Sequence, residues 1–151
     1  MIMAFTEEGL LPPGIYETDF EELKEKMGWS RRRLALLEGL QRAVELMAAS
    51  GVTRVYLDGS FVTDKDRPND IDGCYDPAPD ATAEQLEDMA PIFPPSLDNR
   101  VKAKELYGVD FFPTAATELG SGRPFLRFFQ KDREGRERGV LVLEISGEGA
   151  A

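Results

Sequence analysis

The chain has 151 residues and a formal net charge of −10. It contains no histidine and one cysteine, Cys74, which excludes a histidine-based catalytic triad, a Cys/His zinc site within one chain and an internal disulfide. The excess of acidic residues argues against general DNA binding, and any metal would need oxygen ligands, as Mg²⁺, Mn²⁺ and Ca²⁺ do.

The chain begins with a segment, residues 1–17, that we expect to be irregular. Its prolines and glycine at Leu11-Pro12-Pro13-Gly14 interrupt both helix and central strand. Thr18 and Glu21 then have the spacing of a capping box, which predicts a short helix over residues 19–27.

The next part of the chain predicts a long helix followed by two strands. Ser30 is a suitable N-cap for residues 31–49, where apolar residues recur every three or four positions. Residues 52–57 are rich in strand-forming side chains and predict the first strand. A polar loop over 61–69 leads to a second short strand at 70–75.

A Thr-x-x-Gln capping box predicts a third helix over residues 82–90, before a proline-rich loop. Residues 105–112 predict a further strand. The segment 124–131 fits two interpretations, a helix that starts at Pro124 or an edge strand. Residues 139–145 contain a continuous apolar run, which is typical of a central strand.

This order of elements favours a single α/β (α+β) domain over residues 1–151, with one mixed sheet covered mainly on one face by helices. Residues 146–151 are expected to fray. No apolar run approaches the ~20 residues that cross a bilayer, and the first residues lack the basic start of a signal peptide. We therefore expect a cytoplasmic protein without membrane contact.

Two motifs close together carry the chemistry. A Gly-Ser turn, Gly59-Ser60, follows the first predicted strand, and Asp70-Ile71-Asp72 starts the second. Residues i and i+2 of a strand point to the same face, so Asp70 and Asp72 lie side by side. Two adjacent carboxylates repel each other unless a cation lies between them, as in two-metal phosphoryl-transfer sites.

A third acidic ligand usually completes such a site, and Asp110 is the best candidate because apolar residues flank it in Val109-Asp110-Phe111. A buried charge at that position is costly without a partner. Asp58 and Asp98 are weaker alternatives.

These motifs resemble those of the nucleotidyltransferase superfamily named after DNA polymerase β. Leu57-Asp58-Gly59-Ser60, then Asp70-Ile71-Asp72, then Val109-Asp110-Phe111 match its order and spacing. The size is similar to that of the minimal nucleotidyltransferases, which often act as antitoxins, and residues 56–75 look closer still to a little-characterised bacterial and phage branch. The pattern departs from many active relatives at Phe61-Val62 and at Gly73-Cys74.

The resemblance implies a nucleotidyltransferase fold and a role for each matching residue. Gly59 and Ser60 would contact the triphosphate. Asp70 and Asp72 would hold two Mg²⁺ ions, for which Mn²⁺ can substitute, and Asp110 would bind the ion next to the attacking hydroxyl. The reaction would move an NMP from an NTP to a hydroxyl of a protein or RNA acceptor, with a toxin protein or a tRNA as the leading acceptor.

Basic residues supply the remaining candidates for nucleotide binding. Those considered for the triphosphate are Lys65, Arg67, Lys102 and Lys104. Arg31-Arg32-Arg33, in a first helical turn, is interpreted as a solvent-exposed face. The basic run between 127 and 138 is interpreted as a solvated hairpin, and Cys74 as a small buried apolar residue.

Two functions from different classes follow. The first is an active Mg²⁺-dependent nucleotidyltransferase, the antitoxin of a toxin–antitoxin pair. The second is a catalytically silent module that keeps the fold and caps a partner protein. A minimal domain lacks a second substrate-gripping domain, so a partner chain or a homo-oligomer would complete the cleft.

Overall fold

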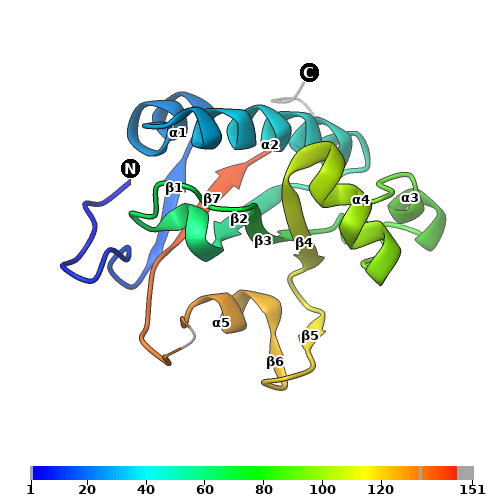
Figure 1. Cartoon of the computed structure of the whole chain (residues 1–151). Coiled ribbons are helices and arrows are strands. Elements are labelled where there is room, and N and C mark those ends of the chain that lie inside the picture. The colour runs from blue at the N-terminus through cyan, green and yellow to red at the C-terminus, as the bar shows by residue number, and fades with distance from the viewer. Residues whose placement is uncertain (1, 133, 146–151) are drawn as a thin grey trace.

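Five strands form one mixed sheet in the computed structural model, which describes residues 2–132 and 134–145 (Figure 1). The strand order is β1-β7-β2-β3-β4. β1 runs parallel to β7 and β3 parallel to β4, whereas β2 is antiparallel to both of its neighbours. The strands are β1 (Ile15–Thr18), β2 (Arg54–Asp58), β3 (Ile71–Asp76), β4 (Val109–Pro113) and β7 (Val140–Glu144). The expected mixed α/β architecture is confirmed.

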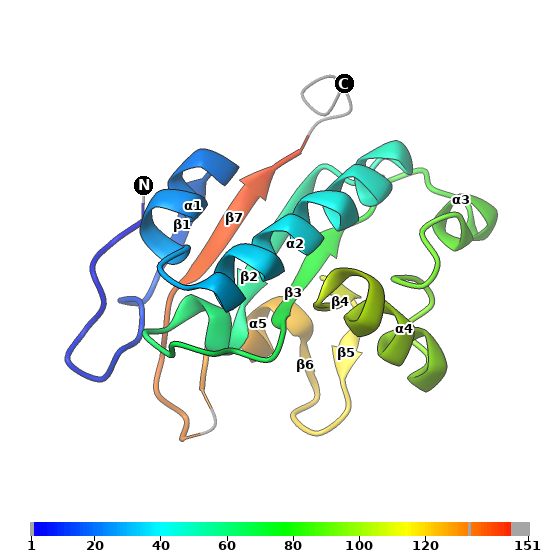
Figure 2. The same cartoon turned by 45° about the horizontal axis from the view of Figure 1, so that its top comes forward.

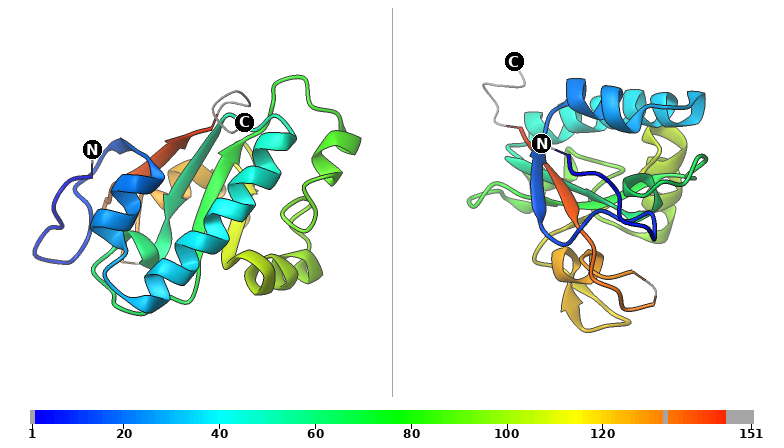
Figure 3. Two further views of the ribbon diagram at one scale, coloured as in Figure 1. Left: turned by 90° about the horizontal axis from the view of Figure 1, so that it is seen from above. Right: turned by 90° about the vertical axis from the view of Figure 1, so that its left-hand side faces the viewer.

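Two helices cover one face of this sheet, α1 (Phe20–Met27) and α2 (Arg31–Ala49) (Figure 3). Figure 2 shows α2 crossing β2 and β3. The apolar stripe of α2, which includes Leu37, Leu40 and Met47, is fully buried with the side chains that the strands turn toward it. This layer forms the larger part of the core.

A smaller layer lies on the opposite face, where α5 (Phe125–Phe129) follows a hairpin of β5 (Thr117–Glu118) and β6 (Arg123–Pro124) (Figure 3). The ring of Phe125 stacks on Phe112 of β4 with centroids 4.0 Å apart. Cys74 is buried in this second apolar cluster, as expected, and burial raises the pKa of its thiol. Segment 124–131 is therefore mainly helical, and Pro124 is the N-cap of α5.

The first 17 residues are not wholly irregular, because β1 begins at Ile15 and pairs with β7. Thr18 belongs to this strand, so the N-cap of α1 is Asp19, whose carboxylate accepts a hydrogen bond from the backbone N–H of Glu22. The predicted helix of 31–49 and its N-cap Ser30 are confirmed.

The strand predicted over 105–112 is wrong in its first half. Helix α4 (Leu97–Tyr107) occupies that half, and β4 begins only after Gly108, which ends the helix with φ +70°. The apolar pattern of α4 is weak because Leu97, Val101 and Leu106 point to solvent. Helix α3 (Ala83–Glu87) keeps the predicted capping box of Thr82 but ends earlier than expected.

The expected frayed tail, 146–151, and Arg133 of the basic run lie outside the described residues. Within 2–132 and 134–145, no helix combines the length and the apolar character needed to cross a membrane.

Candidate metal centre

Three carboxylates converge at one end of strands β3 and β4. Asp72 and Asp110 are direct neighbours in the parallel register of the two strands, and Asp70 lies two residues before Asp72, immediately ahead of β3. Each of the three offers a carboxylate oxygen, and these oxygens lie within 4.8 Å of one another. We call Asp70, Asp72 and Asp110 the carboxylate cluster; its members are those that the spacing predicted.

The local sequence explains why the carboxylates meet. Gly108 ends α4, and its carbonyl oxygen accepts a hydrogen bond of 2.8 Å from the backbone N–H of Ile71. This bond aligns the start of β3 with the start of β4. An Asp-x-Asp at the start of one strand and an aspartate at the second position of the other must then share one face of the sheet.

The Gly-Ser turn lies against the carboxylate cluster. β2 ends at Asp58, and Gly59 opens a short 3₁₀ helix, η1 (Gly59–Val62). Gly59 has φ +77°, and a Cβ atom there would overlap the Asp72 carboxylate. Only glycine combines this conformation with so close an approach. Ser60 is half-buried next to it, and its carbonyl oxygen accepts a hydrogen bond of 2.7 Å from the Thr63 hydroxyl.

Asp58, a weaker alternative as third ligand, is the direct register neighbour of Asp72 on β2 but is not a member of the cluster. It is 1% exposed, and burial raises the pKa of its carboxyl well above the usual range. Nε of Arg138 lies 3.2 Å from Oδ1 of Asp58, and both this cation and a hydrogen bond from the backbone of Gly59 oppose the effect of burial on the Asp58 pKa. This end of the sheet therefore holds a further buried carboxylate, which pairs with Arg138 and is separate from the cluster.

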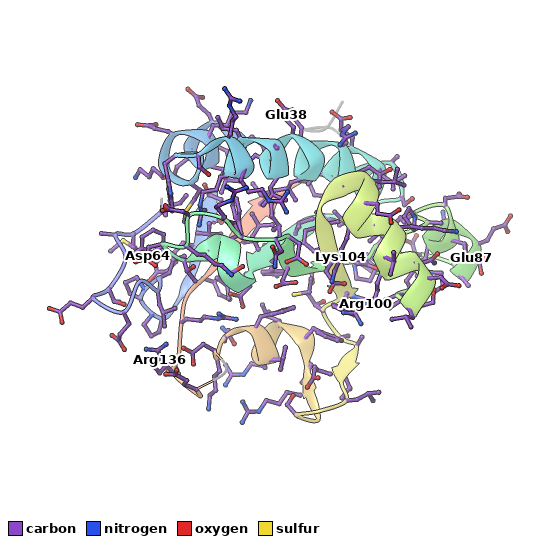
Figure 4. The ribbon with its side chains drawn as sticks, viewed as in Figure 1. Glu38, Asp64, Glu87, Arg100, Lys104 and Arg136 are labelled. Atoms are coloured by element: carbon purple, nitrogen blue, oxygen red, sulfur yellow. The ribbon has the colours of Figure 1, made fainter. Side chains whose placement is uncertain are left out.

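Two cations from α4 face the cluster. Nε and Nη2 of Arg100 donate to the two oxygens of Asp110, at 3.0 and 2.8 Å. Nζ of Lys104 lies 3.5 Å from Oδ2 of Asp70 and 3.8 Å from Oδ2 of Asp110. Figure 4 labels both side chains, which come from successive turns of the helix. Lys104 was among the predicted candidates, whereas Arg100 was missed because α4 was not predicted.

The other predicted basic residues lie elsewhere. Lys65 and Arg67 are exposed in the loop between η1 and β3, and Lys102 is exposed on α4. In the part of the chain that the structure describes, no ion pair links any of these three to the carboxylate cluster. Asp98 is exposed in the first turn of α4 and is likewise not a member.

The loop that carries Lys65 and Arg67 is held by the first turn of α2, where a solvent-exposed face was predicted. That prediction is wrong for Arg33, which is 0% exposed. Its guanidinium donates to the carbonyl oxygens of Met27, Phe61, Thr63 and Lys65. Arg32 is exposed, but it donates to the carbonyl oxygens of Pro68 and Asn69.

These hydrogen bonds fix the connection between the two motifs. Arg33 binds its start, directly after η1, and Arg32 binds its end, directly before Asp70. Burial lowers the pKa of Arg33 to about 10, so it stays charged at neutral pH. Arg31 is exposed, as predicted.

The electrostatics of the carboxylate cluster favour a bound cation. Burial, followed by the charges of Asp70 and Asp110, raises the pKa of Asp72 to about 7, although Lys104 and Arg138 act in the opposite direction. A carboxylate that holds its proton this tightly lacks sufficient positive charge nearby. All of the ligand atoms are oxygens, so the residues present fit a hard divalent cation such as Mg²⁺ or Mn²⁺.

This pKa predicts how stability depends on pH. Unfolded Asp72 titrates near 3.9, so between about pH 4 and pH 7 the folded protein holds a proton that the unfolded chain has lost. The contribution of Asp72 to the free energy of unfolding therefore falls as pH rises through this window and is constant above it.

We expect metal-free Asp72→Asn to melt about 5 °C above the wild type at pH 8, and close to it near pH 4, because the amide carries no charge. Thermal unfolding in EDTA at both pH values tests this. A variant that is markedly less stable at pH 8 would mean that the carboxylate is held for a structural reason.

The chain belongs to DUF6932, a family of unknown function, whose sequence profile matches residues 3–144. No curated protein and no solved structure shows a significant match.

Proposed function

We propose that this member of DUF6932 is a Mg²⁺-dependent nucleotidyltransferase that moves an NMP from an NTP to a hydroxyl of a protein or RNA acceptor. The observation that carries the proposal is the convergence of Asp70, Asp72 and Asp110 beside a Gly-Ser turn whose glycine touches Asp72. Carboxylates from two strands next to a Gly-Ser turn, of which Ser60 is half-buried, would provide a place for cations on one side and phosphates on the other.

Each residue then has a role. Asp70, Asp72 and Asp110 would hold divalent ions, which neutralise the phosphate charge that develops during transfer. Gly59, which has no side chain, would let the backbone of η1 approach the phosphates, and the Ser60 hydroxyl would donate to a phosphate oxygen. Asp110 accepts the proton of the acceptor hydroxyl, whose oxygen forms a bond to the α-phosphorus. The bond from that phosphorus to the bridging oxygen breaks, and pyrophosphate leaves.

Lys65 and Arg67 remain candidates for nucleotide contact in this proposal. Both are exposed in a loop whose two ends are fixed by Arg33 and Arg32. A loop held in this way can present charged side chains to a ligand without a large loss of conformational entropy.

A second function is supported by a specific observation. The fork of Arg100 gives Asp110 a positive partner from the chain itself, an arrangement that would suit a module that retains the fold but has lost catalysis. Phe61 and Val62 depart from the nucleotidyltransferase motif after the Gly-Ser turn. Both are buried in the core, so their side chains would not reach a phosphate bound at the turn. We therefore place the active enzyme first and a silent module that caps a partner protein, such as a toxin, second.

Thermal unfolding of the protein with each of the four NTPs, with and without Mg²⁺, tests the proposal. A ligand at about 100 times its Kd stabilises the folded state by about 2.7 kcal/mol, so we expect the melting temperature to rise by several degrees with at least one NTP. The increase should require Mg²⁺. No response to any NTP, together with a stoichiometric complex with a partner protein, would favour the silent module.

A further inference from the structure

We infer that Arg100 is a phosphate-binding residue that rests on Asp110 until a divalent cation replaces it there. This inference rests on the proposed function and adds a residue that the motif comparison does not supply. It concerns the side chain of Arg100 alone, on the first turns of α4.

Arg100 is placed so that it would compete with a metal ion for Asp110. Its two N–H groups engage both oxygens of Asp110, at 3.0 and 2.8 Å, in a bidentate fork. Asp110 is 5% exposed, so solvent supplies little of its stabilisation in the absence of an ion. A divalent cation bound to Asp110 would lie within a few ångströms of the guanidinium, and like charges at that distance repel strongly. A cation bound at Asp110 would therefore weaken the Arg100–Asp110 hydrogen bonds, and these bonds would weaken cation binding.

The side chain of Arg100 can move away from Asp110 and still keep a contact on the protein surface. It is 39% exposed, and its guanidinium carbon lies 5.1 Å from the ring centroid of Phe112, which offers a cation–π contact. Lys104, one turn further along α4, reaches Asp70 and Asp110 with the same charge. When cations neutralise the carboxylates, we expect the Arg100 guanidinium to be released at Asp110, whose register neighbour Asp72 lies against the Gly-Ser turn.

The guanidinium of Arg100 can bind a phosphate as well as it binds the carboxylate of Asp110. Arginine binds phosphate and carboxylate with the same two parallel N–H groups. Moving Arg100 from Asp110 to a phosphate therefore exchanges one bidentate anion for another.

The test measures Mn²⁺ binding by electron paramagnetic resonance in the absence of nucleotide, with the wild type, Arg100→Gln and the control Arg31→Gln. Arg31 is exposed on α2 and has no ion pair among the described residues. Loss of the fork should tighten Mn²⁺ binding about tenfold in Arg100→Gln and leave the control unchanged. The same proteins are then titrated with inorganic tripolyphosphate in saturating Mg²⁺, where Arg100→Gln should bind about tenfold more weakly.

The outcomes separate this inference from the proposed function. Equal Mn²⁺ affinity in the wild type and Arg100→Gln overturns the inference alone, and so does weaker binding by the variant, since Arg100 would then only support Asp110. Unchanged tripolyphosphate affinity also overturns it. If neither protein binds Mn²⁺, the proposed function fails together with the inference. Arg100→Lys, which keeps the charge without the fork, should show an Mn²⁺ affinity between those of the wild type and Arg100→Gln.

Discussion

Asp70→Asn is expected to lower NMP transfer from an NTP by about 1,000-fold or more while leaving the fold intact. Asp70 lies before β3 and is partly exposed, so the amide fits without repacking. The variant loses one negative ligand of the carboxylate cluster, and a neutral amide oxygen holds Mg²⁺ much less tightly than a carboxylate does. Single-turnover transfer from an α-³²P-labelled NTP, using the base that gives the largest thermal shift, measures the loss.

A matched control removes the same charge elsewhere. Asp80→Asn changes an exposed aspartate that belongs neither to the carboxylate cluster nor to an ion pair in the described residues, so transfer should stay within about twofold of the wild type. Circular dichroism should be unchanged in both variants, and the melting temperature of Asp80→Asn should stay at that of the wild type. Asp70→Asn with wild-type transfer at limiting Mg²⁺ would refute the assignment of Asp70 as a metal ligand.

The parts of the fold that the sequence predicted are those with a strong local signal. The stripe of α2 and the apolar run of β7 each bury one continuous set of side chains, so their periodicity survives in the structure. The carboxylate cluster was predictable for a related reason. Asp-x-Asp at a strand start has one geometric outcome, and Asp110 is an acidic residue between apolar ones on a neighbouring strand.

The missed elements depend on contacts far apart in the sequence. β1 is four residues long and becomes a strand only by pairing with β7, more than 120 residues later, which no local pattern shows. Helix α4 buries only Ala103 among its described residues and lacks an apolar stripe. Its signals were the capping residues Ser96 and Gly108, and with them the helix would have placed Arg100 and Lys104 on one face.

Arg33 was misread because a charge run in a first helical turn is usually solvated. Its neighbours Arg31 and Arg32 are exposed, and only the position of Arg33 on the inward side of α2 distinguishes it. In the 3.6-residue repeat, Arg33 precedes Leu36, Leu37 and Leu40 on the buried face. That phase could have been read from the sequence. The hydrogen-bond partners of Arg33 could not be predicted, because they are backbone carbonyls at the end of α1, in η1 and in the loop after it.

Arg33→Met is expected to destabilise the protein by about 3–5 kcal/mol, which corresponds to a fall of about 10 °C in melting temperature. Five hydrogen bonds from the guanidinium to four carbonyl groups disappear, and methionine offers no donor in exchange. The stacking of the guanidinium on Trp29, 3.7 Å from the ring centroid, is lost as well. Thermal and urea unfolding measure the change, and Arg31→Met, two residues away and exposed, should stay within about 0.5 kcal/mol of the wild type.

The same substitution also tests whether Arg33 positions the site through the loop. Released from Arg33, the segment from Phe61 to Lys65 should exchange its amide hydrogens faster, and the Gly-Ser turn that precedes it should lose its fixed place against Asp72. We therefore expect Arg33→Met to weaken tripolyphosphate binding at a temperature where the variant is still fully folded, while Mn²⁺ binding, which depends on β3 and β4, changes less. Equal losses of both affinities would assign Arg33 a purely global role in stability, and a melting temperature within 2 °C of the wild type would show that the buried guanidinium contributes little to the fold.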